Sequence, residues 1–208
     1  NFTTKKTMMV AQELYEGIDI KGEGTVGLIS YIRTDSKRIS EEAREKAKDY
    51  IVDSIGQNYY KDHTKDSKGK KEKKVQDAHE AIRPTSVERT PDSIKDSLSK
   101  DQYKLYNLIW RRFVASQMED SIFDVLNVEC NIENLVFKAT GSKLKFDGYT
   151  KIYNFTDRED KILPSLSEGE SLKIQKQDPQ QHFTSPPPRY TEASLVNTLE
   201  ELGIGRQS

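Results

Sequence analysis

The stretch GLISYIRTDS, residues 27–36, starts as an apolar run and ends in polar residues around a tyrosine. The run from Val26 to Ile29 predicts a buried strand that leads into Tyr31. If this strand continues through Arg33, the side chains of Tyr31 and Arg33 face the same side of it. A tyrosine oxygen is a usable nucleophile when a cation or a metal assists it, and an arginine neutralises a phosphate under attack. Taken alone the pair is a weak signal, because most Tyr-x-Arg pairs are structural.

A second segment of interest reads DAHEAIRPT, residues 77–85. His79 and Arg83 are four residues apart, so one helical turn would place both on one face, where an imidazole and a guanidinium suit a phosphate. The alternative is a capping histidine and a surface arginine before Pro84, which would end the helix.

A third segment reads SPPPRYTEASL, residues 185–195, and is followed by Gly203, Gly205 and Arg206. The two glycines would bring the backbone close to another group, and Arg206 would direct a positive charge there. The alternative is a simple helix C-cap.

The composition sets limits on the class of protein. The 208 residues include 33 basic and 34 acidic ones, a net charge of −1, so any nucleic-acid contact must come from local patches. The single cysteine, Cys130, excludes an internal disulfide and a cysteine-cluster metal site, and its apolar neighbours predict a buried core thiol. No apolar run approaches the ~20 residues that span a bilayer. We therefore expect no membrane association and a reducing, cytoplasmic setting.

The first part of the chain has the sequence pattern of helices. Helices are predicted from Thr4 to Gly17, from a Ser40 cap to about Ile55, and from Ser99, where Gln102 completes a capping box. The last of these helices carries a wide apolar face, which indicates packing in a core. Its members are Leu105, Tyr106, Ile109, Trp110, Phe113 and Val114.

From residue 121 the hydrophobic period changes from helical to alternating. Strands are predicted at 125–132, at 135–140 and 143–146 around a Gly141-Ser142 hairpin turn, and at 171–175. A last helix follows the Thr191 cap and ends at Gly203, with a buried stripe formed by Leu195, Leu199 and Leu202. The predicted fold class is α+β: a mainly helical part with Tyr31, then a β-rich segment and a short C-terminal helix.

A lysine-rich stretch runs from Lys61 to Lys74 and has no hydrophobic period. A solvated loop is the simpler interpretation, and a contact with a nucleic-acid backbone is the alternative.

Taken together and in this order, the three segments resemble motifs of the type IA DNA topoisomerases. The stretch GLISYIRTDS is similar to the signature around that family's active-site tyrosine, and AHEAIRPT and SPPPRYTEASLV…LEELGIGR are similar to two further motifs. The resemblance runs across nearly all 208 residues, including DGYTKIY and QHFTSPPPRY. Ile32, between Tyr31 and Arg33, is typical of the bacterial topoisomerase I branch.

The resemblance implies a role for each site residue. Tyr31 would attack a phosphodiester of single-stranded or underwound DNA, form a 5′-phosphotyrosine and let another strand pass, without ATP. Arg33 would position the scissile phosphate and stabilise its charge. His79 and Arg83 would contact the bound strand, and Arg206 would touch DNA or brace the site. The implied activity is relaxation of negatively supercoiled DNA in the cytoplasm, at the nucleoid.

The chain also departs from the family pattern. The family uses Mg²⁺ held by a glutamate and an Asp-x-Asp-x-Asp or Asp-x-Asp-x-Glu cluster, and we find no such cluster in this chain. Gln207 stands where the family usually has proline. We therefore expect a fragment without the metal-binding module, inactive by itself. Its expected parts are a helical gate domain at 1–118, part of a β-rich arch at 119–185 and the start of a base domain at 186–208.

Two other functions and one further partner remain open at this point. The fragment could act as a non-catalytic module that binds single-stranded DNA, because the metal ligands are absent. A tyrosine recombinase also uses Tyr, Arg and His, but its tyrosine follows a His-x-x-Arg motif, whereas here the order is reversed and the spacing is His-x-x-x-Arg. The leucine stripe of the last helix could pair two copies of the fragment.

Overall fold

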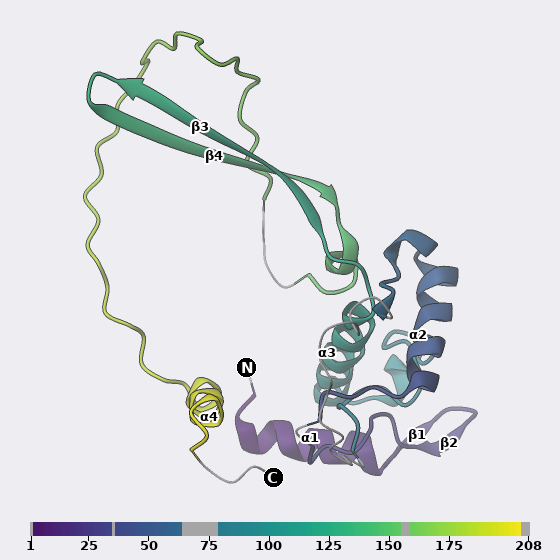
Figure 1. Cartoon of the computed structure of the whole chain (residues 1–208). Coiled ribbons are helices and arrows are strands. Elements are labelled where there is room, and N and C mark those ends of the chain that lie inside the picture. Colours follow the sequence, from purple (N-terminus) through teal and green to yellow (C-terminus); the bar gives the residue numbers. More distant parts are fainter. Residues whose placement is uncertain (1, 35, 64–78, 155–158, 205–208) are drawn as a thin grey trace. The chain divides into compact units, whose positions relative to one another are not determined.

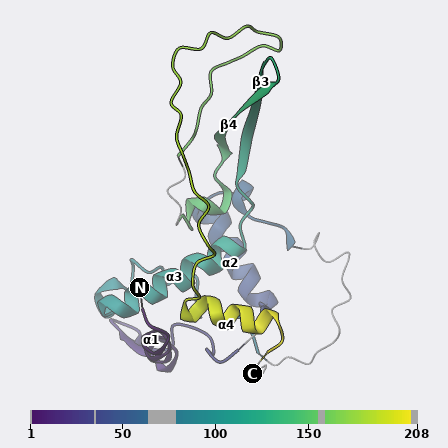
Figure 2. The same cartoon turned by 90° about the vertical axis from the view of Figure 1, so that its left-hand side faces the viewer.

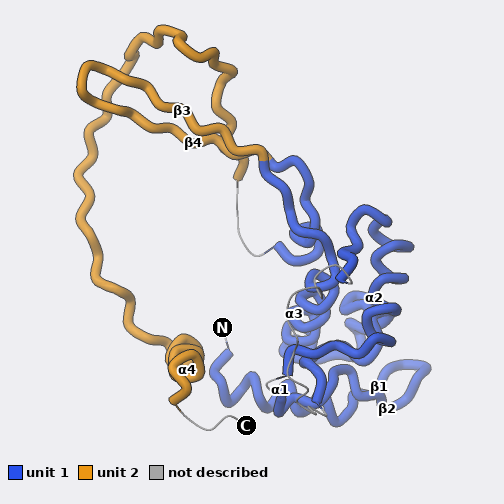
Figure 3. Tube along the Cα trace, viewed as in Figure 1, with its two compact units in different colours: residues 1–123, 144–158, 206–208 blue, residues 124–143, 159–205 orange. Residues whose placement is uncertain are grey.

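The computed structural model describes residues 2–34, 36–63, 79–154 and 159–204. Within them the chain forms two compact units, coloured separately in Figure 3. Unit 1 comprises Asn1–Phe123, Leu144–Arg158 and Arg206–Ser208, and unit 2 comprises Asp124–Lys143 and Glu159–Gly205. Helices and two-stranded antiparallel sheets occur together, which confirms the α+β class. The three predicted domains remain a prediction, because compact units do not by themselves assign domains.

Three helices form the frame of unit 1 and confirm the sequence prediction (Figure 1). They are α1 (Thr4–Glu16), α2 (Glu41–Ser54) and α3 (Lys100–Ser116). The side chains of Thr3, Ser40 and Ser99 cap them, and Ser99 with Gln102 makes both bonds of a capping box. Short 3-10 turns lie at Gln57–Tyr59, Lys95–Ser97 and Gly148–Lys151.

The core of unit 1 lies between these helices. Helix α1 packs against α3, and Tyr50 of α2 meets Trp110 of α3 edge to face, with 5.5 Å between ring centroids. The apolar face predicted for α3 is buried at Leu105, Tyr106, Trp110, Phe113 and Val114. The Trp110 indole donates to the Val87 carbonyl at 2.9 Å, so its one polar group is satisfied inside the core.

The strand predicted at Val26–Ile29 is wrong in its extent. Strands β1 (Ile18–Ile20) and β2 (Gly24–Val26) form an antiparallel hairpin that ends at Val26. The Leu28 amide donates instead to the Leu14 carbonyl at the end of α1, at 2.8 Å. An amide used in this way cannot continue the hairpin ladder. Only Ile29 makes a further bridge, an isolated one with Pro84.

Strands β3 (Ile122–Ile132) and β4 (Leu135–Phe146) form a long narrow hairpin (Figure 2). The predicted turn at Gly141-Ser142 is wrong, because β4 runs through it and the chain reverses after Ile132. Glu133 adopts φ 53° in that reversal. Gly141 is needed for packing, since a Cβ there would lie 2.9 Å from the Lys161 carbonyl oxygen and from Leu163 Cγ.

Two further predictions for unit 2 are wrong in this structure. The segment 171–175 has the alternating pattern of a strand but forms none, and its Leu172 and Ile174 are exposed. A strand needs a hydrogen-bonded neighbour, which the described residues do not supply here. Cys130, which lies on the two-stranded ribbon, is half-buried rather than buried.

Helix α4 (Glu192–Glu201) has the caps that were predicted. Thr191 caps its start in a capping box with Ser194, and Gly203 follows its end with φ 67°. The expected buried stripe is wrong: none of the residues of α4 is buried, and its leucines are at least 36% exposed. No helix among the described residues is both long and apolar enough to cross a bilayer.

Candidate functional site around Tyr31

The backbone before Tyr31 is held by a segment more than fifty residues later in the chain. The Ser30 amide donates to the Arg83 carbonyl at 2.9 Å, and the Thr85 amide donates to the Leu28 carbonyl at 3.0 Å. Between these bonds Ile29 bridges Pro84 in antiparallel fashion. Leu28 and Ile29 are at most 1% exposed, so Tyr31 follows a segment that is anchored in the core.

The hydroxyl of Ser30 ties the two segments together a second time. It donates to the Ala81 carbonyl at 2.8 Å and accepts from the Arg83 amide at 2.9 Å. The Ala81 amide donates in turn to the Arg38 carbonyl at 2.8 Å. Segment 79–85 is therefore hydrogen-bonded both to Ser30, which precedes Tyr31 in the sequence, and to Arg38, which follows it.

Tyr31 itself is 40% exposed, whereas Ile32 beside it is 7% exposed. Its ring lies 5.6 Å from the His79 ring in a stacked arrangement, with 27° between the planes. The Tyr15 ring lies 5.5 Å from the Tyr31 ring at 68°, an edge contact. Two aromatic rings from distant parts of the chain thus contact Tyr31 while part of its side chain faces solvent.

Arg83 is bound by a neighbouring carboxylate. Its Nε and Nη2 lie 2.8 and 2.7 Å from one oxygen of Glu80, and its Nη1 donates to the Pro84 carbonyl at 3.1 Å. Burial alone would raise the pKa of Glu80, but hydrogen bonds from Arg83 and Ser40 and the charges of Arg83 and Arg38 lower it below its usual 4.5. The carboxylate is therefore ionised at neutral pH and orients the guanidinium.

Comparison with known proteins gives this cluster its context. Residues 1–208 match the sequence model of a family described as DNA topoisomerase. The chain belongs to the bacterial type IA DNA topoisomerases. A solved structure of full-length topoisomerase I from Thermotoga maritima is similar to 99% of the chain, with 42% sequence identity and a TM-score of 0.79. The present chain spans 32% of the length of that topoisomerase, about one third.

The structure of this topoisomerase chain brings only some of the predicted site residues together. Tyr31 and His79 are in ring contact, and Arg83 lies on the segment that holds Tyr31. The expected helical turn from His79 to Arg83 is wrong, because these residues form no helix and instead pair with the chain around Ser30.

The remaining predicted residues are less well placed. The strand that would place Tyr31 and Arg33 on the same side does not continue through Arg33, because residues 31–34 form bends and irregular backbone; Arg33 is exposed beside the buried Ile32. Arg206 lies outside the described residues, as does most of the lysine-rich stretch Lys61–Lys74.

Three residues of the cluster were missed by reasoning from the sequence. Glu80 stands three before Arg83, and the spacing of a helical ion pair could have suggested the contact. Ser30 is a neighbour of Tyr31 with no distinguishing pattern. Tyr15 lies sixteen residues before Tyr31, and no local signal connects the two rings.

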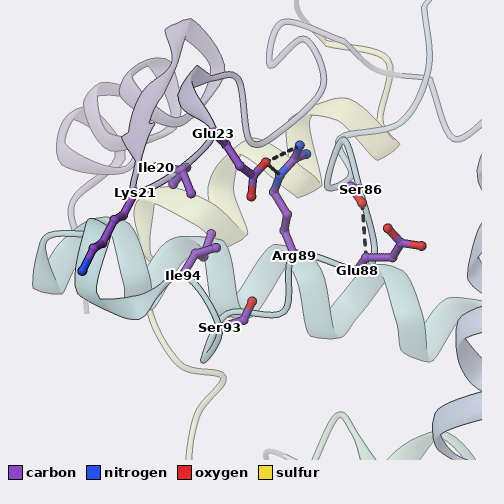
Figure 4. Close-up of a pocket in the computed structure, with 8 residues that line it drawn as sticks. All are labelled: Ile20, Lys21, Glu23, Ser86, Glu88, Arg89, Ser93 and Ile94. Carbon is purple, nitrogen blue, oxygen red and sulfur yellow. Dashed lines mark hydrogen bonds and ion pairs between the residues drawn. The ribbon is translucent and has the colours of Figure 1, made fainter.

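A surface pocket of unit 1 is made of residues outside this cluster (Figure 4). It is crossed by an ion pair of Arg89 and Glu23 at 2.8 Å. The eight lining residues are Ile20, Lys21, Glu23, Ser86, Glu88, Arg89, Ser93 and Ile94. The one arginine of the pocket is therefore already paired with a carboxylate.

Residues able to hold a metal ion do not gather in the described part of the chain. Across residues 2–34, 36–63, 79–154 and 159–204, no three His, Cys, Asp or Glu side chains lie close enough to bind a metal ion together. The Mg²⁺ that the family resemblance implies therefore does not fit the donors seen around Tyr31.

Proposed function

We propose that Tyr31 is the nucleophile of a type IA topoisomerase reaction that relaxes negatively supercoiled DNA. The observation that carries the proposal is the contrast between the anchored backbone at Leu28 and Ile29 and the exposed Tyr31 side chain. A nucleophile needs a fixed backbone and a side chain that substrate can reach, and Tyr31 combines an anchored backbone before it with a side chain that is 40% exposed. The family match supports DNA as the partner.

The proposed chemistry is an exchange of phosphodiester bonds. The Tyr31 oxygen loses its proton and forms a bond to phosphorus, while the bond from phosphorus to the 3′ oxygen of the neighbouring nucleotide breaks and that oxygen takes up a proton. The product is a 5′-phosphotyrosine and a free 3′ hydroxyl. After another strand has passed, the 3′ hydroxyl attacks the phosphotyrosine, which restores the DNA phosphodiester and the free Tyr31 hydroxyl. Because each bond broken is replaced by a similar one, no ATP is required.

The basic residues around Tyr31 are proposed to bind the DNA strand. Arg33 would meet the scissile phosphate, since it is exposed and two residues after Tyr31. His79 would contact the same strand beside the Tyr31 ring, against which it stacks. Arg83, oriented by Glu80, would shape the pocket for the backbone. For Arg206 the role remains as the family resemblance implies, contact with DNA or support of the site.

The activity of the isolated chain is a separate proposal. The chain spans 32% of the length of the Thermotoga topoisomerase, and no metal-binding group occurs in its described part. We expect the isolated chain not to relax supercoiled DNA, with or without added Mg²⁺. Pairing of two copies and a location at the nucleoid also remain predictions.

A chimera tests the proposed function. Residues 1–208 would replace the matched third of the Thermotoga topoisomerase, and relaxation and covalent DNA adducts would be measured with Mg²⁺ present. The unchanged chimera should form the adduct, and Tyr31→Phe should form none, because only the phenolic oxygen is removed. Tyr190→Phe, at a tyrosine that is 64% exposed, is the matched control and should keep the adduct. An adduct that survives in Tyr31→Phe would identify another nucleophile.

A non-catalytic module that binds single-stranded DNA is the second candidate. The observation in its favour is that metal ligands do not gather in the described part of the chain. Binding of an oligonucleotide by the isolated chain should then weaken with salt, with a slope set by the few phosphates contacted. A chimera that forms no adduct, together with salt-dependent binding by the chain, would favour this module over the enzyme.

A further inference from the structure

The Tyr15 ring is one of the two rings that contact Tyr31. It belongs to the last turn of α1 and meets the Tyr31 ring at 68°, with 5.5 Å between centroids. Edge contacts of this geometry are favourable, because the positive ring edge meets the negative ring face. Tyr15 is 38% exposed, so burial in the core does not explain its position.

The backbone of Tyr15 is fixed to the segment that leads to Tyr31. The Leu28 amide donates to the carbonyl of Leu14, whose side chain is fully buried. A Cβ on Gly27 would lie 2.9 Å from the Tyr15 carbonyl oxygen, so only glycine allows the two backbones to approach this closely. Backbone contacts therefore fix the end of α1, which carries the Tyr15 ring, close to the segment that leads to Tyr31.

We propose that Tyr15 is a positioning residue for Tyr31, a role that rests on the proposed function of Tyr31 as the nucleophile. An exposed tyrosine has several staggered side-chain conformations, and in-line attack on phosphorus requires one of them. The rings of Tyr15 and His79 together restrict the Tyr31 ring to the observed conformation. Tyr15 takes no part in proton transfer or in binding the phosphate.

The proposal predicts how three variants differ. Tyr15→Ala removes the ring and frees Tyr31, whereas Tyr15→Phe keeps the ring and should behave like the unchanged protein. Met9→Ala is the control, because Met9 lies on the same helix and is 55% exposed. It removes a similar exposed apolar side chain at a position that makes no ring contact with Tyr31.

The ring geometry is tested by NMR on the complete 208-residue chain with ring-labelled tyrosine and histidine. The unchanged chain and Tyr15→Phe should show an NOE between the rings of Tyr31 and His79. In Tyr15→Ala this NOE should weaken and the Tyr31 ring signals should move toward averaged positions, while in Met9→Ala neither should change. If Tyr15→Ala leaves the NOE and the signals of Tyr31 unchanged, the proposal is overturned.

The chimera described above gives the second readout, single-turnover cleavage of an oligonucleotide. For Tyr15→Ala the cleavage rate of bound DNA should fall roughly 10-fold, with unchanged oligonucleotide affinity and full rescue by Tyr15→Phe. Weaker binding with an unchanged rate would make Tyr15 a base-stacking residue and overturn the positioning role. If the unchanged chimera does not cleave, the proposed function fails, and the NMR result still decides whether Tyr15 holds Tyr31.

Discussion

The guanidinium of Arg83 binds one carboxylate oxygen of Glu80 through two nitrogens, Nε at 2.8 Å and Nη2 at 2.7 Å. Both side chains are less than a quarter exposed, so this pair is better shielded from water than a surface ion pair. It lies on the segment whose backbone holds Ser30, the residue before Tyr31. The pair therefore connects the orientation of a basic group to the segment that carries the candidate nucleophile.

Glu80→Gln should make the chain less stable at neutral pH and change its response to acid. The pKa of Glu80 is lowered in the folded chain, so its stabilisation is present above pH 4.5 and is lost as the pH falls below that value. We expect a loss of about 1 kcal/mol in the free energy of unfolding at pH 7, and a smaller loss toward pH 3. Urea unfolding at several pH values measures both.

Glu42→Gln is the matched control for this experiment. The Lys46 hydrogen bond lowers the pKa of Glu42 as well, but both partners of that pair are more than 60% exposed. The unfolding midpoint of Glu42→Gln should stay with that of the unchanged chain at each pH. Equal effects of the two substitutions would mean that the Glu80 pair has no special role.

Ser30→Ala should loosen the segment that carries Arg83. The substitution removes one hydroxyl that makes two hydrogen bonds, to the Ala81 carbonyl and from the Arg83 amide. We expect the free energy of unfolding to fall by about 1–2 kcal/mol and amide hydrogen exchange at Arg83 to become faster. Ser93→Ala removes a hydroxyl that bonds only within its own turn, to the Thr90 carbonyl, and should leave exchange at Arg83 unchanged. If amide exchange at Arg83 in Ser30→Ala is as slow as in the unchanged chain, the Ser30 hydroxyl does not hold the segment that carries Arg83.

Tyr106→Phe tests how much the hydroxyl of a buried core tyrosine contributes to stability. Burial raises the pKa of the Tyr106 hydroxyl, although the Arg89 charge acts in the opposite direction, and the hydroxyl donates to the Arg89 carbonyl at 2.7 Å. Its stabilisation is present below pH 10 and is lost as the pH rises above that value. The free energy of unfolding of the variant should be about 1 kcal/mol lower at pH 7, and its stability should decline less steeply above pH 10.

Thermal unfolding between pH 7 and pH 11 measures this effect. Tyr190→Phe serves as the comparison, because Tyr190 is 64% exposed and its substitution should leave the unfolding curve unchanged. If the stability of Tyr106→Phe declines above pH 10 as steeply as that of the unchanged chain, the decline is caused by other titrating groups.

The helices were predictable because their signals are local. Ser40, Ser99 and Thr191 are N-caps in the sequence and in the structure, and the apolar spacing after Ser99 gives the buried face of α3. The candidate nucleophile was also found locally, since Tyr31 lies within a long family motif. Its neighbours were not, because Ile29 and Pro84 pair across 55 positions and Tyr15 contacts Tyr31 from helix α1, sixteen residues earlier.

The turn of the hairpin formed by β3 and β4 was mispredicted because a glycine has two possible uses. Gly141 suggested a turn, yet its lack of a side chain serves the close approach of Lys161 and Leu163. The actual reversal uses Glu133, a residue type that rarely adopts a positive φ. The missing strand at 171–175 has a similar cause, since an alternating pattern becomes a strand only where a partner is available.

Glu133→Gly should stabilise the hairpin of β3 and β4. Glu133 holds φ 53°, where a Cβ is strained and glycine is not, so relief of strain should outweigh the extra freedom of the unfolded chain by about 0.5 kcal/mol. Amide exchange along β3 and β4 should slow, because this turn closes the ribbon. Gly141→Ala should do the opposite and speed exchange at Ser142 and Lys161, whose amides donate to each other's carbonyls. Faster exchange in Glu133→Gly would show that the glutamate contributes more to the turn than its strained backbone costs.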